Sequence, residues 1–120
     1  MSKKILFISR HAPYGSSLAR DALDALLASA AYDQSLALLL MDDGVMQLLA
    51  GQNADLIDQK NFASVLPVLE LYDVEQIYVH SESLLKRGIE KNELIDLPLT
   101  LLNSNEVADL ISSQQQILSF

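Results

Sequence analysis

Hydrophobic residues in this chain form short continuous runs that alternate with longer stretches of helical spacing. Residues 4–9 and 35–41 are almost continuously apolar, which is typical of strands buried on both faces. Between them, Leu18, Ala22 and Leu26 recur at the spacing of one helix face. The pattern therefore predicts a strand, a helix to about residue 31, and a second strand.

The rest of the chain continues this alternation, with one strand, turn and helix at its centre. The predicted helices are at residues 45–50, 62–72, 81–87 and 103–112, with a polar loop at 52–61. The predicted strands are the central strand at 75–80, a strand at 97–102 and a last strand at 116–120. Pro67 indicates a kink or a late helix start. Pro98 cannot donate to a ladder, so it favours a strand end or an edge strand.

Capping residues stand at most of the predicted helix starts. They are Ser16 or Ser17, Asp43, Ser81, and Asn103 with Glu106 as a capping box. Gly51 and Gly88 are placed to end helices, and Gly88 is expected to take the left-handed conformation. The elements predict a single α/β domain over residues 1–120. Its architecture is three-layered and flavodoxin-like, a five-stranded, mainly parallel sheet with helices on both faces.

Apolar residues make up half of the 120 positions, and the mean hydropathy is +0.20. This apolar content is high for a small soluble chain, so we expect some apolar surface to meet a partner. The second half of the first helix and the short helix after the second strand are apolar on nearly every side. Their candidate interface residues are Ala22, Leu26, Ala30, Val45, Met46 and Leu49. For Met46 and Leu49, packing in the core is the alternative to an interface role.

Charge and cysteine content exclude several classes of function. The net charge of −8 argues against direct nucleic-acid binding. The chain has no cysteine, and therefore no disulfide, no thiolate zinc site and no sulfur nucleophile. No apolar run approaches the roughly 18 residues that span a bilayer. We expect a cytoplasmic protein.

Polar residues that follow the strands are the candidates for chemistry. His11, Asp42 and His80 would line a cleft at the carboxyl ends of the strands, where open α/β sheets place their ligands. The strands before His11 and His80 are expected to be neighbours. Two imidazoles can hold a metal, but no third ligand is evident. The Gly15 loop offers backbone N–H groups to an anion, although a plain turn is the simpler interpretation.

The acidic pair Asp42 and Asp43 suggests the receiver domain of response regulators. That fold also needs a phosphoacceptor aspartate at the end of another strand and a lysine near the last one. His80 occupies the first place, and residues 114–120 contain no lysine. Asp43 is better explained as a helix cap.

Several segments spread over the whole chain resemble the TusC (DsrF-like) sulfur relay proteins of the DsrE/DsrF/DsrH-like family. The most specific is Asp-Gly-Val-Met-Gln-Leu-Leu-Ala-Gly-Gln at residues 43–52. Weaker segments are residues 12–15, 20–28, 71–76, 83–88 and 117–120. The resemblance implies a DsrEFH-like fold and no cofactor. It also implies a cytoplasmic hexamer with two copies each of TusB-like, TusC-like and TusD-like subunits.

In such a complex the TusD-like subunit carries the persulfide. Sulfur arrives from a TusA-like donor and passes to a TusE-like acceptor, toward 2-thiouridine at the tRNA wobble position. Sister subunits that carry sulfur have a cysteine where this chain has His80. An imidazole cannot hold a sulfane sulfur as a thiolate does. The resemblance thus implies a non-catalytic, structural subunit; a small ligand-binding domain or enzyme is the alternative.

Overall fold

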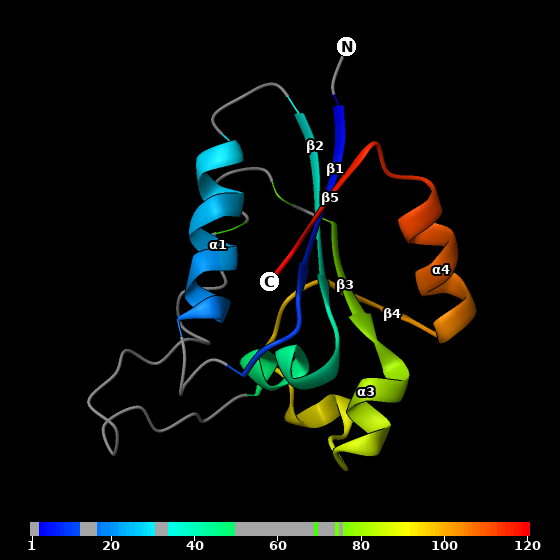
Figure 1. The fold of residues 1–120 in the computed structure, drawn as a ribbon. Coiled ribbons are helices and arrows are strands. Elements are labelled where there is room, and N and C mark those ends of the chain that lie inside the picture. Colours follow the sequence, from blue (N-terminus) through cyan, green and yellow to red (C-terminus); the bar gives the residue numbers. More distant parts are fainter. Residues whose placement is uncertain (1–2, 13–16, 31–33, 50–68, 70–73, 75) are drawn as a thin grey trace.

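The computed structural model describes residues 3–12, 17–30, 34–49, 69, 74 and 76–120 (Figure 1). Its elements are β1 (Lys3–Ser9), α1 (Leu18–Ser29), β2 (Gln34–Leu40), the 3-10 helix η1 (Asp42–Leu48), β3 (Gln76–His80), α3 (Ser81–Lys86), the 3-10 helix η4 (Lys91–Glu93), β4 (Leu99–Leu102), α4 (Ser104–Ser112) and β5 (Gln116–Ser119). The five strands form one sheet in the order β4-β3-β2-β1-β5, and every neighbouring pair is parallel. The predicted α/β fold is confirmed.

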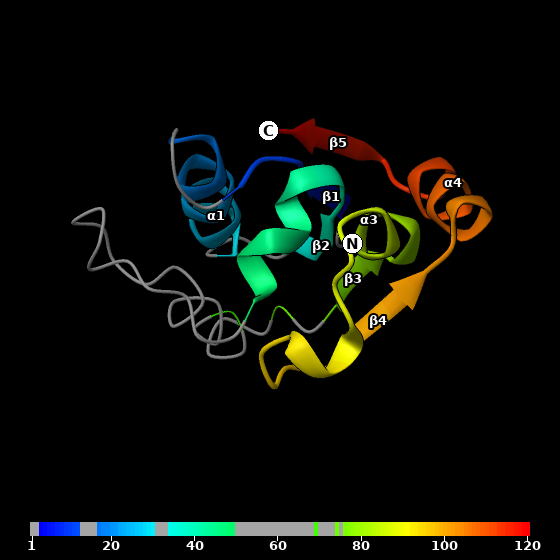
Figure 2. The ribbon, with the colours of Figure 1, turned by 90° about the horizontal axis from the view of Figure 1, so that it is seen from below.

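Helices cover both faces of the sheet, α1 on one side and α4 on the other (Figure 1). Successive side chains of a strand point to opposite faces, so β1 sends Ile5 and Phe7 toward α1 and Leu6 and Ile8 toward α4. Both faces are buried, which explains why β1 and β2 are continuous apolar runs. The 3-10 helix η1 and the helix α3 lie at the carboxyl end of the strands (Figure 2).

Local helix-end chemistry was predicted correctly at α4 and at Gly88. Asn103 Oδ1 accepts from Glu106 N at 2.8 Å, and Glu106 Oε1 accepts from Asn103 N at 3.0 Å, which completes the capping box. Gly88 has φ 65°, in the left-handed region. These contacts involve residues within one or two turns of each other, so sequence alone specifies them.

The other predicted caps are wrong in detail. Ser81 is the first residue of α3, and its hydroxyl donates to Leu102 O at 3.0 Å. Ser17 is at the N-cap position of α1, but its hydroxyl donates to Asp21 Oδ2 at 3.1 Å and makes no capping bond. Asp43 lies inside η1. In each case a tertiary or side-chain partner takes the group that capping would have used. Ser16, the other predicted cap of α1, lies outside the described residues.

Some element boundaries also differ from the prediction. The short helix expected at 45–50 is the 3-10 helix η1, which begins earlier at Asp42. The strand expected at 97–102 begins at Leu99, because Pro98 cannot join the ladder. That strand, β4, is at an edge of the sheet, as Pro98 indicates. The polar loop and most of the third helix fall outside the described residues, except for buried Leu69.

Candidate functional site

The carboxyl ends of the parallel strands meet at one edge of the sheet, where β3 ends at His80 and β4 at Leu102. The strand β2 lies between β1 and β3. The expectation that the strands before His11 and His80 are neighbours is therefore wrong, because strand order is set by long-range pairing. His11 is exposed just after β1.

Both ring nitrogens of His80 are engaged by serine hydroxyls. Nδ1 lies 2.7 Å from Ser83 Oγ, and Nε2 lies 2.9 Å from Ser104 Oγ. Ser83 Oγ in turn accepts from Asp42 N at 2.9 Å. The His80 side chain is only 12% exposed. Through these bonds His80 joins three segments that follow different strands: the start of η1, the helix α3 and the start of α4.

The pattern of donors and acceptors favours one tautomer of His80. Ser83 is buried, and its oxygen already accepts from Asp42 N. Its hydroxyl hydrogen is satisfied when it is donated to Nδ1 of His80, which puts the ring hydrogen on Nε2. Nε2–H then donates to Ser104 Oγ. In this arrangement His80 is no base for Ser104. Ser83, whose hydroxyl His80 does accept, is only 2% exposed, so the contacts position helices rather than present an activated nucleophile to a substrate.

Replacing His80 with alanine should lower the free energy of unfolding by about 2 kcal/mol, because the buried Ser83 hydroxyl loses its acceptor. Urea denaturation measures the change. His11→Ala is the matched control: His11 is exposed, so its substitution should stay within about 0.5 kcal/mol. An unchanged midpoint for His80→Ala would show that the serine contacts stabilise nothing.

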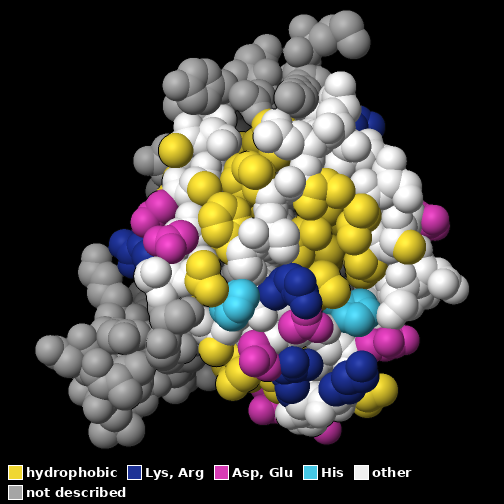
Figure 3. All heavy atoms as spheres, viewed as in Figure 1, with side chains coloured by type: hydrophobic (Ala, Val, Ile, Leu, Met, Phe, Trp, Pro, Cys, Tyr) yellow, Lys and Arg dark blue, Asp and Glu magenta, His cyan; other side chains and the backbone are white. Residues whose placement is uncertain are grey.

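The two aspartates after β2 are each paired with a different arginine. Arg10 Nε lies 2.8 Å from Asp42 Oδ2, and Arg87 Nη2 lies 2.8 Å from Asp43 Oδ1. Figure 3 shows basic (dark blue) and acidic (magenta) side chains lying between the two histidines (cyan). Paired carboxylates of this kind are less available as metal ligands or phosphoacceptors. Among the residues the structure describes, no group of three or more His, Cys, Asp and Glu can hold a metal.

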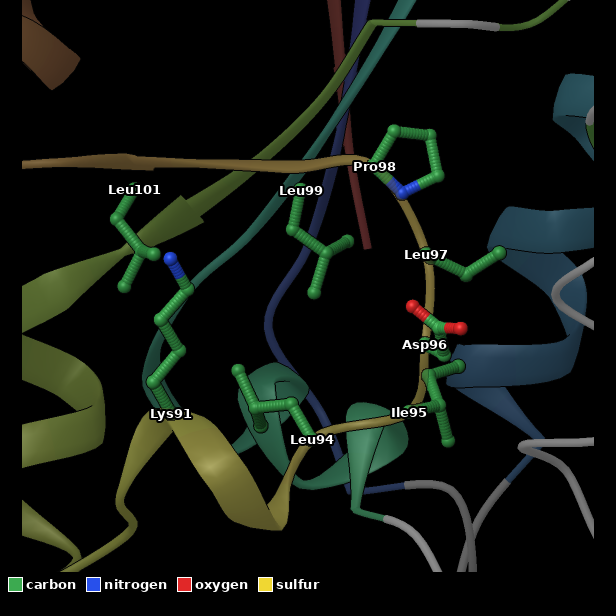
Figure 4. A pocket seen from close by; sticks show the side chains of 8 residues that line it. All are labelled: Lys91, Leu94, Ile95, Asp96, Leu97, Pro98, Leu99 and Leu101. Atoms are coloured by element: carbon green, nitrogen blue, oxygen red, sulfur yellow. The ribbon is translucent and has the colours of Figure 1, made fainter.

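A pocket of about 310 Å³ lies beside β4, away from the His80 contacts (Figure 4). It is lined by Lys91, Leu94, Ile95, Asp96, Leu97, Pro98, Leu99 and Leu101. Figure 4 shows Lys91 reaching toward β4 across the pocket. This pocket was not predicted from the sequence. The alternating leucines around Pro98 were its only signal, because the pocket forms where residues 91–97 fold back under the edge strand.

Half of the candidate interface is buried inside this chain. Ala22, Leu26 and Val45 are at most 1% exposed and belong to the core. The elements α1 and η1 turn these three side chains against the sheet, and their interface role stays an untested prediction. Met46 is 36% exposed, and Leu49, like Ala30, is partly buried. The interface role of these last three residues stays a prediction.

Comparison with known proteins finds the DsrE/DsrF-like family, whose model matches residues 3–120. A TusC homolog of Vibrio parahaemolyticus is 37% identical over 117 residues, covering 98% of each chain. The intracellular sulfur oxidation protein DsrF of Allochromatium vinosum is 34% identical over 131 residues, covering 98% of this chain and 96% of that one. The crystal structure of the ychN protein from E. coli has a TM-score of 0.83 at 28% identity, covering 98% and 99%.

Within the described residues, no helix is both long and apolar enough to cross a membrane.

Proposed function

Because the chain belongs to the DsrE/DsrF-like family, we propose that it is a non-catalytic, structural subunit of a TusBCD-type sulfur relay complex. In this role it supports persulfide transfer toward 2-thiouridine at the tRNA wobble position, in the cytoplasm. The predicted single domain over residues 1–120 is part of the proposal.

The absence of cysteine carries this proposal. A relay step needs a thiolate to accept the sulfane sulfur, and the 120 residues contain none. His80, at the position that holds cysteine in sulfur-carrying sister subunits, has both ring nitrogens hydrogen-bonded to serines. The reactive sulfur must then reside on a companion subunit, and this chain contributes surface and shape.

The partners follow from the same family role. TusB-like and TusD-like sister subunits, two copies of each, would complete a heterohexamer with this chain. A TusA-like donor and a TusE-like acceptor would meet the complex rather than this subunit alone. The relative named intracellular sulfur oxidation protein DsrF makes sulfur oxidation the other pathway such a subunit can serve. The net charge of −8 gives no basis for direct contact with tRNA.

Co-expression with TusB-like and TusD-like subunits tests the proposal. We expect one complex with equal amounts of the three chains, because a structural subunit is needed for assembly. Labelled sulfur should appear on the TusD-like chain and never on this one, as measured by mass spectrometry. A well-behaved monomer that ignores both sister subunits would contradict the proposal.

A second measurement separates the structural role from a ligand-binding or enzymatic role of the cleft near His11, Asp42 and His80. Complexes assembled with the His80→Ala variant should transfer sulfur at the rate of the unmodified complex. If transfer is lost while assembly stays intact, the histidine takes part in the chemistry and the structural proposal fails.

A further inference from the structure

The strand β5 forms one margin of the sheet, and its outer backbone groups have no described partner. It pairs with β1 on its inner side only. Phe120 N donates to Ile8 O at 2.8 Å and Phe120 O accepts from Arg10 N at 3.0 Å, so both groups of Phe120 face β1. Because the direction of these groups alternates along a strand, Ile117 and Ser119 point theirs outward. Figure 2 shows β5 at the margin of the molecule.

The opposite margin of the sheet carries features that discourage pairing, and β5 carries none of them. Pro98 immediately precedes β4, and Lys91 reaches toward that strand (Figure 4). Proline and lysine are the residues that natural proteins use to protect edge strands. The residues of β5 are Gln, Ile, Leu and Ser, without a charge or a proline. An unprotected edge of this kind is a site for pairing with another strand.

Apolar side chains continue on both sides of β5. Ile117 is 40% exposed. Leu118 and Phe120 are partly buried against the α1 side of the core, and Ile111 of α4 is partly buried on the other side. Figure 3 shows hydrophobic side chains gathered on the face that carries β5, between α1 and α4. Pairing at this edge would therefore remove apolar area from water as well as satisfy backbone groups.

We propose that this edge binds the β5 strand of a second copy of the same chain, antiparallel and in a register centred on Leu118. In that register Ile117 lies opposite Ser119 of the second copy, and each such pair exchanges both backbone hydrogen bonds. Leu118 lies opposite Leu118 of the second copy. The two-fold axis makes the contact self-complementary.

The uncharged composition of β5 suits a second copy of the same strand as the occupant. The β5 edge offers no charge to attract a charged segment of another protein. Two copies of β5 bring only uncharged side chains together, so the overall charge of −8 on each chain is kept away from the contact. The pairing needs no other subunit and goes beyond the proposed sulfur relay role.

A single cysteine in this cysteine-free chain tests the register. Opposite residues in a non-hydrogen-bonded antiparallel pair have Cα atoms about 4.5 Å apart, within the range of about 4.4–6.8 Å that a disulfide spans. The Leu118→Cys variant, oxidised at low concentration, should form a covalent dimer on a non-reducing gel. Thr100→Cys, on the exposed face of β4, is the matched control and should stay monomeric. Equal cross-linking of both variants overturns the proposal.

Sedimentation of the unmodified chain and of Ile117→Lys provides the second measurement. The unmodified chain should be a dimer. The lysine should shift it to monomer, since it puts a charge into the contact and brings the two introduced lysine side chains close together, diagonally across the same face of the pair. Ile117 is exposed, so circular dichroism should show an unchanged fold. A monomeric unmodified chain, or a dimer that survives Ile117→Lys, refutes pairing through β5. So does a Leu118→Cys chain that cross-links to a sister subunit in the co-expressed complex. If sister subunits co-purify but Leu118→Cys forms no dimer of this chain, the relay proposal stands and only the β5 pairing is refuted.

Discussion

Replacing Gly44 with alanine is expected to lower the free energy of unfolding by about 3 kcal/mol. A Cβ at this position would lie 2.8 Å from the carbonyl carbon of Ser9, 3.2 Å from Arg10 N, and closer still to the carbonyl oxygen of Ser9. These are backbone atoms at the end of β1, so they cannot rotate away as a side chain would. Urea denaturation of the variant measures the loss.

Gly88→Ala is the matched control for this prediction. Gly88 has φ 65°, but a Cβ there would meet no atom within 4 Å. The substitution should therefore lower stability only through the left-handed backbone, by about 1 kcal/mol. If the two variants were equally stable, close packing of Gly44 on β1 would not be the reason for glycine at that position.

The second large effect is expected for Gln47→Leu, at about 2 kcal/mol of unfolding free energy. Gln47 is 2% exposed, and its Nε2 donates to Ser9 Oγ at 2.7 Å and to His11 O at 3.0 Å. Leucine keeps most of the volume but leaves the buried Ser9 hydroxyl without this partner. Urea denaturation of the single variant gives the value.

A double-mutant cycle with Ser9→Ala identifies the contact responsible. Ser9 and Gln47 touch directly, so their effects should not add. In the Ser9→Ala background, Gln47→Leu should destabilise the protein clearly less than it does in the unmodified chain. Additive effects would show that the hydrogen bond between them contributes nothing.

Both variants lie in the sequence run that most clearly resembles the sulfur relay family, residues 43–52. Its described residues have structural roles: Gly44 packs on the end of β1, Val45 and Leu48 are in the core, and Gln47 connects η1 to Ser9 and His11. The run thus identifies the fold through packing constraints rather than through reactive groups.

Local patterns predicted the strands and the fold class well, because β1 and β2 must be apolar on both faces and the helices on one. The strand order was beyond such patterns. Nothing in the residues around His11 and His80 states that β2 runs between their strands. The Ser81 cap failed for a related reason, since its hydroxyl found Leu102 O on the neighbouring strand.

The candidate site was located by position only. His80 was placed correctly at the end of the central strand, but its partners were missed. Ser104 lies 24 residues away, and the contact exists only because β3 and β4 pair with His80 opposite Leu102. Serine near the start of the helix after a neighbouring strand was the available signal, and the sequence offers several equivalent serines.

The protection of β4 by Pro98 and Lys91 limits the size of any assembly built through sheet margins. A sheet receptive at both margins adds molecules without end and grows into a fibre. Here a molecule joined through β5 presents only the blocked margins of its two sheets to the next one, so growth stops at a pair. An apolar-rich chain can thereby join sheets without polymerising.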